Sequence, residues 1–380
     1  MISTKESYRW HAFSVFVSAT TILLNIELDW PLMRLSQMRL LPNFIDHYAV
    51  FDFIPCISDD LLICKQYYYG QAYLEIIAPL NRFTMTETIL LILFVALFLI
   101  VVSCLIQVNS FYRLILMQAF ILSPPVMFLL ERGNLELLIF SLIAISVIRP
   151  LSRLNLIQSF TLFFASLIKF YPVALLILVF LRTKSTLSRI YFLLLIASFA
   201  FIVSRLDFPL KMGATETYCC SFGNNIWGLY LIRLGLNINH LYISLIGLIF
   251  FSLVYVVSLL VFNRSYVANN LAKEMTLFQT DKHLPLQSFL IIFALLYFSG
   301  TNFDYKLMYL SIIPILLLSN LELSQKGKVF HLLAFCAISV FTFPSGYLQP
   351  LGDFFLLCYF VFLLHVLFPL MKRKIHINNQ

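Results

Sequence analysis

Lys169 is the residue whose surroundings most favour binding of a phosphate group. It follows a mostly apolar stretch and precedes Phe-Tyr-Pro, so its ammonium must reach toward the membrane surface or meet an anion. Pro172 breaks the apolar segment 154–182, and broken helix ends offer backbone groups and partial charges to a ligand. A lipid phosphate would satisfy both the ammonium and the helix ends.

A second polar segment, Glu131-Arg132-Gly133-Asn134, follows an apolar stretch that contains Ser123-Pro124-Pro125. The planar guanidinium of Arg132 matches two oxygens of a phosphate, and Glu131 would orient it. The same residues also fit a capped turn between two helices, with Gly133 in the tight backbone position. Both interpretations agree with the sequence.

A third charged group contains Asp304 and Lys306, with Asn302, between two short apolar segments. A role in substrate binding and an internal ion pair are the two explanations. In the topology predicted below, Lys306 joins Arg132 and Lys169 on the outer side of the membrane.

The carboxylates suited to act as a general base lie in the long polar segment after the first apolar run. We choose Asp46, because a carboxylate there would take a proton from an acceptor hydroxyl as that oxygen attacks a sugar carbon. The alternatives for Asp46 are a helix cap and a solvated side chain. Asp59 and Asp60 would hold a divalent cation or cap a helix. We predict no other metal site and no other cofactor.

Motifs typical of several other enzyme classes are missing. The sequence has no Gly-rich phosphate loop before a Lys-Ser/Thr pair, no HExxH helix and no paired CxxC. It also has no soluble domain for a nucleotide sugar. Any reaction must therefore use groups at the membrane surface, acting on a lipid-borne substrate.

The elements that hold these residues are predicted to be membrane helices. Of 380 residues, 61% are hydrophobic and 12% are charged, whereas about 25% are charged in a soluble domain. Apolar runs separated by short polar breaks suit a hydrocarbon core of about 30 Å. We therefore predict one all-α, polytopic membrane domain over residues 1–380. The ten expected spans lie near 11–28, 87–108, 113–130, 135–148, 187–205, 241–262, 286–300, 306–319, 329–343 and 351–370.

The segment 154–182 is expected to form a broken re-entrant hairpin in place of a span. Its two halves have roughly 13 and 11 residues, and the longer half would rise about 20 Å as a helix. Such a hairpin enters and leaves on the same side, with Lys169 at its tip.

The distribution of charges predicts the orientation. The net charge of +8 is explained by cytoplasmic loops rich in Lys and Arg, so no nucleic-acid partner is expected. With the N-terminus inside, most of the 26 basic residues lie in the cytoplasm, as do both termini. Most acidic residues then face outward, which the insertion rule does not require, so we attribute their position to function. The acidic residues that fall inside are Glu6, Glu274, Asp281 and Glu322.

Two loops dominate the predicted outer face. Loop 29–86 mixes aromatic and charged residues in a way that favours short helices lying in the interface, and 206–240 is the second loop. Cys56 and Cys64 in the first loop are either a disulfide, if that side is oxidising, or unpaired thiols.

Six short motifs, in this order, resemble the bacterial branch of the GT-C membrane glycosyltransferases, which includes polyprenyl-phosphate-mannose-dependent α-mannosyltransferases. The resemblance covers roughly residues 40–310. The motifs are Phe44-Ile45-Asp46, Tyr69-Gly70, the segment 123–134 from Ser-Pro-Pro to Glu-Arg-Gly-Asn, Lys169-Phe170-Tyr171-Pro172, Phe222-Gly223-Asn224-Asn225 and Asn302-Phe303-Asp304-Tyr305-Lys306-Leu307.

The resemblance implies a GT-C-like fold and inverting transfer of a sugar from a polyprenyl phosphate on the periplasmic side. The family's base, an Asp in the first outer loop, falls on Asp46, and Lys169 would contact the donor phosphate. Arg132 and Lys306 would be supporting cations. The other residues expected in the donor site are Glu131, Asn134, Tyr171 and Asp304.

Two departures from the family pattern concern the acceptor site. The first loop continues from Tyr69-Gly70 into Gln71-Ala72-Tyr73 where the family has Asn-Tyr-Pro. His47 stands beside Asp46, and the Arg expected shortly after the Asp is absent. Asp52 is therefore the alternative base.

The predicted function is transfer of a hexose, mannose by analogy, from a polyprenyl-phosphate donor to a glycolipid or growing glycan at the outer leaflet. The predicted location is the bacterial plasma membrane, with the active face toward the periplasm. The main alternative is a transporter or flippase of a lipid-linked sugar, since broken helices and buried cations also serve transporters. A non-catalytic scaffold is a third interpretation, and it leaves the outward acidic residues unexplained.

Overall fold

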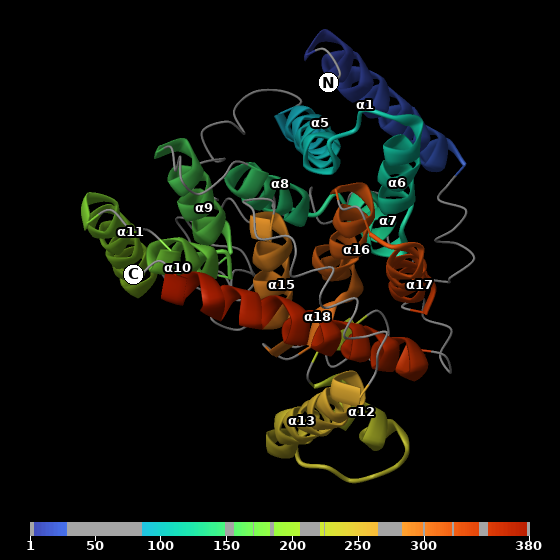
Figure 1. Cartoon of the computed structure of the whole chain (residues 1–380), viewed down its shortest axis with the longest axis vertical. Coiled ribbons are helices and arrows are strands. Elements are labelled where there is room, and N and C mark those ends of the chain that lie inside the picture. The colour runs from blue at the N-terminus through green and yellow to red at the C-terminus, as the bar shows by residue number, and fades with distance from the viewer. Residues whose placement is uncertain are drawn as a thin grey trace. The chain divides into compact units, whose positions relative to one another are not determined.

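The computed structural model describes most of the chain outside the long first loop (Figure 1). The described residues are 4–28, 86–148, 156–169, 171–182, 186–205, 221–223, 225–264, 283–298, 301–320, 323–341 and 349–377. Their regular secondary structure is helical apart from two three-residue strands, β1 (Ser221–Gly223) and β2 (Thr301–Phe303), so the all-α prediction is confirmed for this part of the chain.

The helices follow the apolar runs of the sequence. The α-helices are α1 (Thr4–Glu27), α5 (Thr86–Ile106), α6 (Phe111–Ile121), α7 (Pro124–Arg132), α8 (Glu136–Ile148), α9 (Leu156–Ile168), α10 (Val173–Arg182), α11 (Thr186–Arg205), α12 (Ile226–Arg233), α13 (His240–Arg264), α15 (His283–Phe298), α16 (Met308–Asn320), α17 (Gln325–Phe341) and α18 (Gln349–Ile377). A 3₁₀ helix, η5 (Asp304–Leu307), follows β2. Each of the ten segments predicted as spans overlaps one or two helices, and the crossing of the membrane by all ten stays a prediction.

Three described helices are long and apolar enough to cross a membrane, over Thr88–Ile106, Tyr242–Val261 and Gln349–Val366. The pair α6 and α7 would make a fourth span if it crosses as one unit. Five further helices are apolar but shorter, and α8, α9 and α16 are among them. The chain thus has the helices of a membrane protein, as its composition predicted.

The expected span at 113–130 is not one straight helix. It consists of α6 and α7, which meet at an angle of 61°. Pro124 and Pro125 explain the break, because proline has no N–H to continue the helical hydrogen bonds but is well suited to a helix's first turn. The predicted span thus contains a break at Leu122–Ser123, and its crossing of the membrane as one unit stays a prediction.

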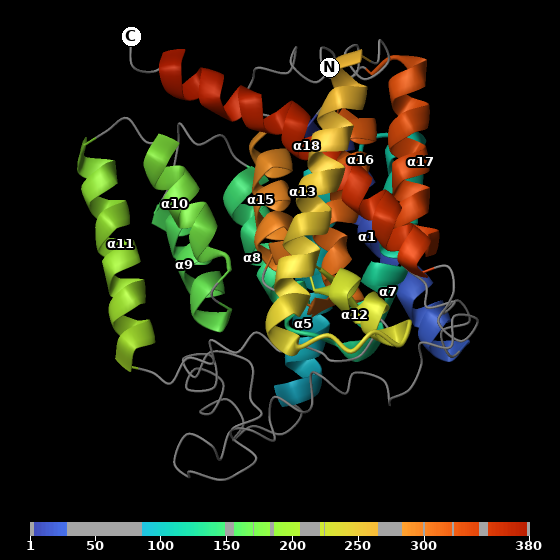
Figure 2. The ribbon, with the colours of Figure 1, turned by 90° about the horizontal axis from the view of Figure 1, so that it is seen from below.

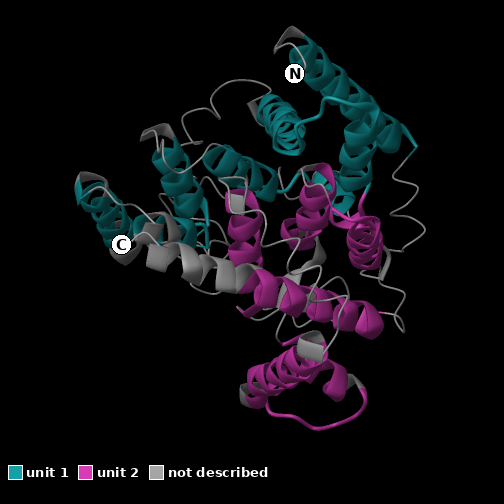
Figure 3. Ribbon diagram, viewed as in Figure 1, with its two compact units in different colours: residues 1–34, 39–122, 126–213 teal, residues 35–38, 123–125, 214–380 magenta. Residues whose placement is uncertain are grey.

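The chain divides into two compact units (Figure 3). Unit 1 comprises residues 1–34, 39–122 and 126–213, and in it α8 packs against both α5 and α9. The helices α9, α10 and α11 contact one another and lie side by side in Figure 2. Rings from three helices form part of its core: Phe98 of α5, Phe120 of α6 and Phe140 of α8 have centroids 5.4–6.4 Å apart.

Hydrogen bonds between polar side chains join α1 to its neighbours in unit 1. Ser103 of α5 lies 2.8 Å from His11 Nδ1 and 2.7 Å from Ser14 Oγ. Gln118 of α6 donates to Ser18 at 2.7 Å. Such contacts stabilise helix packing where the surroundings are apolar.

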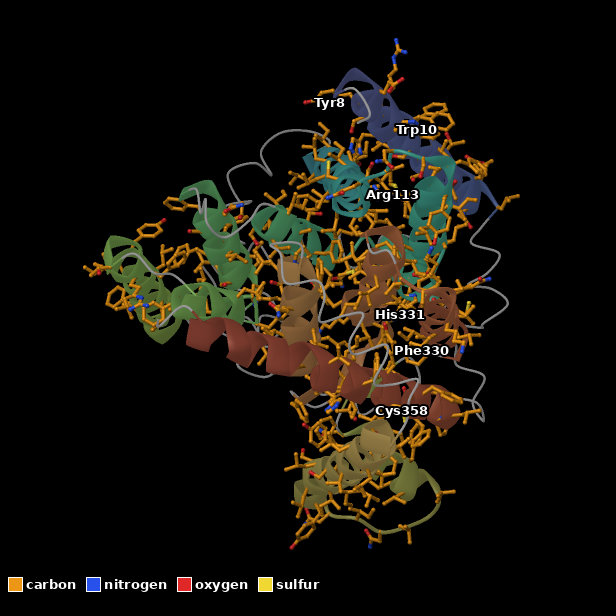
Figure 4. All side chains as sticks on the ribbon, in the orientation of Figure 1. Tyr8, Trp10, Arg113, Phe330, His331 and Cys358 are labelled. Atoms are coloured by element: carbon orange, nitrogen blue, oxygen red, sulfur yellow. The ribbon has the colours of Figure 1, made fainter. Side chains whose placement is uncertain are left out.

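Unit 2 comprises residues 35–38, 123–125 and 214–380. Within it α16 packs against α15 and α17, α18 contacts α17 and α13, and α12 packs on α13. Figure 4 labels Phe330 and His331 on α17, and the Nδ1 atom of His331 lies 3.0 Å from the hydroxyl of Tyr359 on α18.

The predicted break in the segment 154–182 is confirmed. α9 ends at Ile168, α10 begins at Val173, and the two helices contact each other. Pro172 cannot donate a hydrogen bond back to the carbonyl of Ile168, so the helix cannot continue through it. The side from which this pair enters the membrane stays a prediction.

Several predictions fall outside the described residues. They are the candidate bases Asp46 and Asp52, the pair Asp59–Asp60, the Cys56–Cys64 disulfide and the interfacial helices expected in loop 29–86. The second outer loop, 206–240, is partly described and contains β1 and α12, which the sequence analysis did not predict.

Candidate functional site

The predicted hairpin tip begins where α9 ends. The amide of Lys169 still donates to the Ala165 carbonyl, at 3.0 Å, so Lys169 completes the last turn of α9. Tyr171 opens the next turn, and its carbonyl accepts from Ala174 at 3.3 Å. The helix break thus presents an ammonium and a phenol close together in the chain.

Both of these side chains converge on Glu136, the first residue of α8. Lys169 Nζ donates to Glu136 Oε1 at 2.8 Å, and the Tyr171 hydroxyl donates to Glu136 Oε2. The Glu136 side chain is 0% exposed, whereas that of Lys169 is 14% exposed. The carboxylate is therefore buried between α8 and the end of α9, and the lysine is the member of the pair that keeps some exposed surface.

The local structure favours a carboxylate at this position. Asn134 Oδ1 accepts from the amide of Glu136 at 3.0 Å, which caps the first turn of α8. The partial positive charge of a helix N-terminus stabilises an acidic residue, and the partial negative charge of a C-terminus stabilises a cation. Glu136 at the start of α8 and Lys169 at the end of α9 satisfy both preferences.

The Glu131–Asn134 segment forms the turn between α7 and α8. The amide of Asn134 donates to the Leu129 carbonyl at 3.3 Å, and the amide of Gly133 donates to the Leu130 carbonyl at 3.1 Å. Together they make a Schellman motif, with Gly133 at φ 60°. The capped-turn interpretation is correct for the backbone.

The charged residues of this turn differ in exposure. Glu131 is 3% exposed, and Arg132 is half-buried. The guanidinium carbon of Arg132 lies 5.5 Å from the centre of the Phe128 ring, one helical turn earlier, in a cation–π contact. A role for either residue in phosphate binding stays a prediction.

In unit 2, the two remaining described motifs lie side by side. β1 pairs antiparallel with β2, and Phe222 is opposite Asn302. The chain continues from β2 directly into η5, which begins at Asp304 and contains the half-buried Lys306. The motifs at 222–225 and 302–307, about 80 residues apart, therefore meet through their backbones.

Sequence reasoning missed a second buried carboxylate, Asp353 of α18, which is 4% exposed. Its Oδ2 accepts a hydrogen bond from the hydroxyl of Tyr230 on α12. Trp227, also on α12, donates to the hydroxyl of Tyr297 on α15 at 3.0 Å. Both acids could have been found in the sequence, because each stands at the start of an apolar run.

No group of three or more His, Cys, Asp or Glu side chains that could hold a metal ion occurs among the described residues. The pair Asp59–Asp60, proposed above for a divalent cation, is outside them.

The structure thus brings four of the predicted or newly found site residues together in unit 1: Asn134, Glu136, Lys169 and Tyr171. Asp304 and Lys306 belong to unit 2. Comparisons of the chain with protein-family models, curated proteins and solved structures found no match.

Proposed function

We propose that the protein is a multi-pass membrane glycosyltransferase that uses a polyprenyl-phosphate sugar as donor. The sugar is a hexose, mannose by analogy with the family that the motifs resemble, and the acceptor is a glycolipid or a growing glycan. The ten spans are α1, α5, the pair α6–α7, α8, α11, α13, α15, α16, α17 and α18. The pair α9–α10 is the re-entrant hairpin, and the active face is periplasmic.

The observation that carries this proposal is the cation at the helix break. Lys169 lies at the end of an apolar helix. A charged side chain there costs free energy unless it is paired, and such residues usually have a function. It is held by Glu136 and lies beside Tyr171, yet keeps part of its side chain exposed. This is the arrangement that a binding site for a lipid phosphate requires, because the phosphate stays at the surface while its chain lies in the membrane.

In the proposed reaction, Asp46 accepts the proton of an acceptor hydroxyl. The oxygen attacks the anomeric carbon from the face opposite the phosphate, and a new C–O bond forms there with inversion. The bond between that carbon and the phosphate oxygen breaks, and its electron pair leaves with the polyprenyl phosphate. Lys169, supported by Arg132, stabilises the negative charge on the leaving phosphate.

The test compares Asp46→Asn with Asp52→Asn in purified, reconstituted protein. Asp46→Asn should abolish incorporation of labelled sugar into the acceptor, while insertion and thermal stability stay unchanged. Asp52→Asn should leave most activity, since Asp52 lies in the same loop but is not the base. Undiminished transfer by Asp46→Asn would refute the role of Asp46, and loss with Asp52→Asn alone would move the base to Asp52.

A transporter or flippase of a lipid-linked sugar is the second candidate. The observation in its favour is the presence of two broken helical segments, α6–α7 and α9–α10, because discontinuous helices form the ion and substrate sites of many transporters. The motif order and the outward acidic residues favour the transferase.

A further inference from the structure

We infer that Glu136 is a positioning residue for the donor phosphate, which it never contacts itself. This inference rests on the proposed function, because it assigns to Glu136 a role at the same hairpin tip. Glu136 holds Lys169 through one carboxylate oxygen and Tyr171 through the other. One buried side chain therefore sets the position of both polar groups of the tip.

The exposure of the pair gives each partner a distinct role. A fully buried carboxylate is out of reach of a lipid headgroup at the surface, whereas the ammonium beside it remains partly exposed. The lysine is thus the member that faces a ligand. The hydrogen bond to Glu136 restricts the conformations of the Lys169 side chain.

Positioning matters here because lysine has a long and flexible side chain. An ammonium on four rotatable bonds loses conformational entropy when it binds an anion, and a site that has already ordered it avoids that loss on binding. The hydrogen bond from Lys169 to Glu136 supplies this order before a ligand arrives. The Tyr171 hydroxyl fixes the second oxygen of the same carboxylate, which stops the carboxylate from turning away.

A carboxylate so close to a phosphate site would weaken binding if its charge were not offset. Glu136 lies at the N-terminus of α8, and Asn134 caps the same turn. The helix dipole and the lysine share the stabilisation of its negative charge. The arrangement therefore orders the lysine without presenting a second exposed charge to the ligand.

The experiment measures binding of polyprenyl monophosphate, and of the matching polyprenol without phosphate, to the protein in nanodiscs. The wild-type protein should prefer the phosphate, and Lys169→Met should lose that preference. Glu136→Gln should weaken binding of polyprenyl phosphate about tenfold or more, as expected for loss of a charged hydrogen bond, and leave polyprenol binding unchanged. In the Lys169→Met background, Glu136→Gln should have no further effect. Glu6→Gln and Lys328→Met are the matched controls, since both residues are exposed.

Two results would overturn the inference. Equal weakening for the phosphate and the polyprenol would show that Glu136 only maintains the fold. A full effect of Glu136→Gln in the Lys169→Met background would show that Glu136 acts without Lys169. If Glu136→Gln does not fold, Tyr171→Phe replaces it, because this variant keeps the ion pair. It should weaken phosphate binding about threefold, as for loss of one neutral hydrogen bond, and no change would overturn the inference.

The same measurements separate this inference from the proposed function. A protein that binds polyprenyl phosphate through Lys169 and Glu136 but transfers no sugar would refute the transferase and leave the positioning role intact. A protein that transfers sugar with unchanged donor affinity and KM in Glu136→Gln would refute the positioning role alone.

Discussion

Glu136 in unit 1 and Asp353 in unit 2 make an informative comparison. Both carboxylates are almost completely buried, and both accept a hydrogen bond from a tyrosine hydroxyl. They differ in their other surroundings. Glu136 also binds the ammonium of Lys169 at a helix break, whereas Asp353 is the fifth residue of the 29-residue helix α18, and its tyrosine comes from the short helix α12.

The same acid–phenol contact has different neighbours in the two units. At the predicted hairpin tip the carboxylate also accepts a hydrogen bond from the partly exposed ammonium of Lys169, which fits the phosphate site that we propose. In unit 2 the contact links α12 to α18. A second hydrogen bond from α12, donated by Trp227, links it to Tyr297 of α15. α12 packs against β1, so this fastening also supports the strand that carries the 222–225 motif.

The largest effect on stability is expected from Glu136→Ala. It removes the carboxylate from the mostly buried Lys169 ammonium, and breaking a buried ion pair typically costs about 3–5 kcal/mol of unfolding free energy. The double variant Glu136→Leu with Lys169→Met removes both charges and should recover most of that loss. Chemical denaturation in a mild detergent measures both. A double variant as unstable as Glu136→Ala would show that the charge left behind is not the cause.

A smaller loss is expected from Tyr230→Phe. It removes the hydrogen bond to the buried carboxyl of Asp353 without changing the packing volume, and should cost about 1–3 kcal/mol. Tyr242→Phe is the control, because Tyr242 is 57% exposed. The same denaturation measurement applies. Equal stability of the two variants would show that the hydrogen bond to Asp353 does not stabilise the position of α12.

Gly228→Ala tests how closely α12 packs against α13. A Cβ atom at Gly228 would lie 2.8 Å from Ile243 Cγ2, 2.9 Å from Ile243 Cα and 3.1 Å from the Ile243 carbonyl oxygen. The added methyl must push α12 away from α13, at a cost of about 1–3 kcal/mol. Since two of the three contacts are with backbone atoms, Ile243→Ala should not restore the loss. Full recovery in the double variant would mean that the two helices can separate easily.

The sequence was sufficient to predict most of the described helices and the break at Pro172. The continuous apolar runs 87–108 and 241–262 form α5 and α13. The helix α9 ends at Ile168, shortly before the proline at 172. These features depend on local chemistry, which a single sequence shows directly. The break between α6 and α7 depends on Pro124 in the same way and was open to prediction.

Contacts between distant residues were not open to prediction. Lys169 was expected to meet an anion, but its partner Glu136 is 33 residues away, and Tyr230 and Asp353 are 123 residues apart. Nothing in the local pattern links such pairs. The strands β1 and β2 have three residues each, which is too short for an alternating pattern to be visible.

The proposed function requires that the protein make a glycosidic bond. The most direct test supplies reconstituted protein with a polyprenyl-phosphate sugar labelled in the hexose and a glycolipid acceptor, and follows both lipids by mass spectrometry. We predict that the acceptor gains one hexose with inverted anomeric configuration while an equal amount of free polyprenyl phosphate appears, and that Lys169→Met slows both changes together. Movement of the intact labelled donor across the membrane, with no hexose added to any acceptor, would contradict the claim and establish a transporter instead.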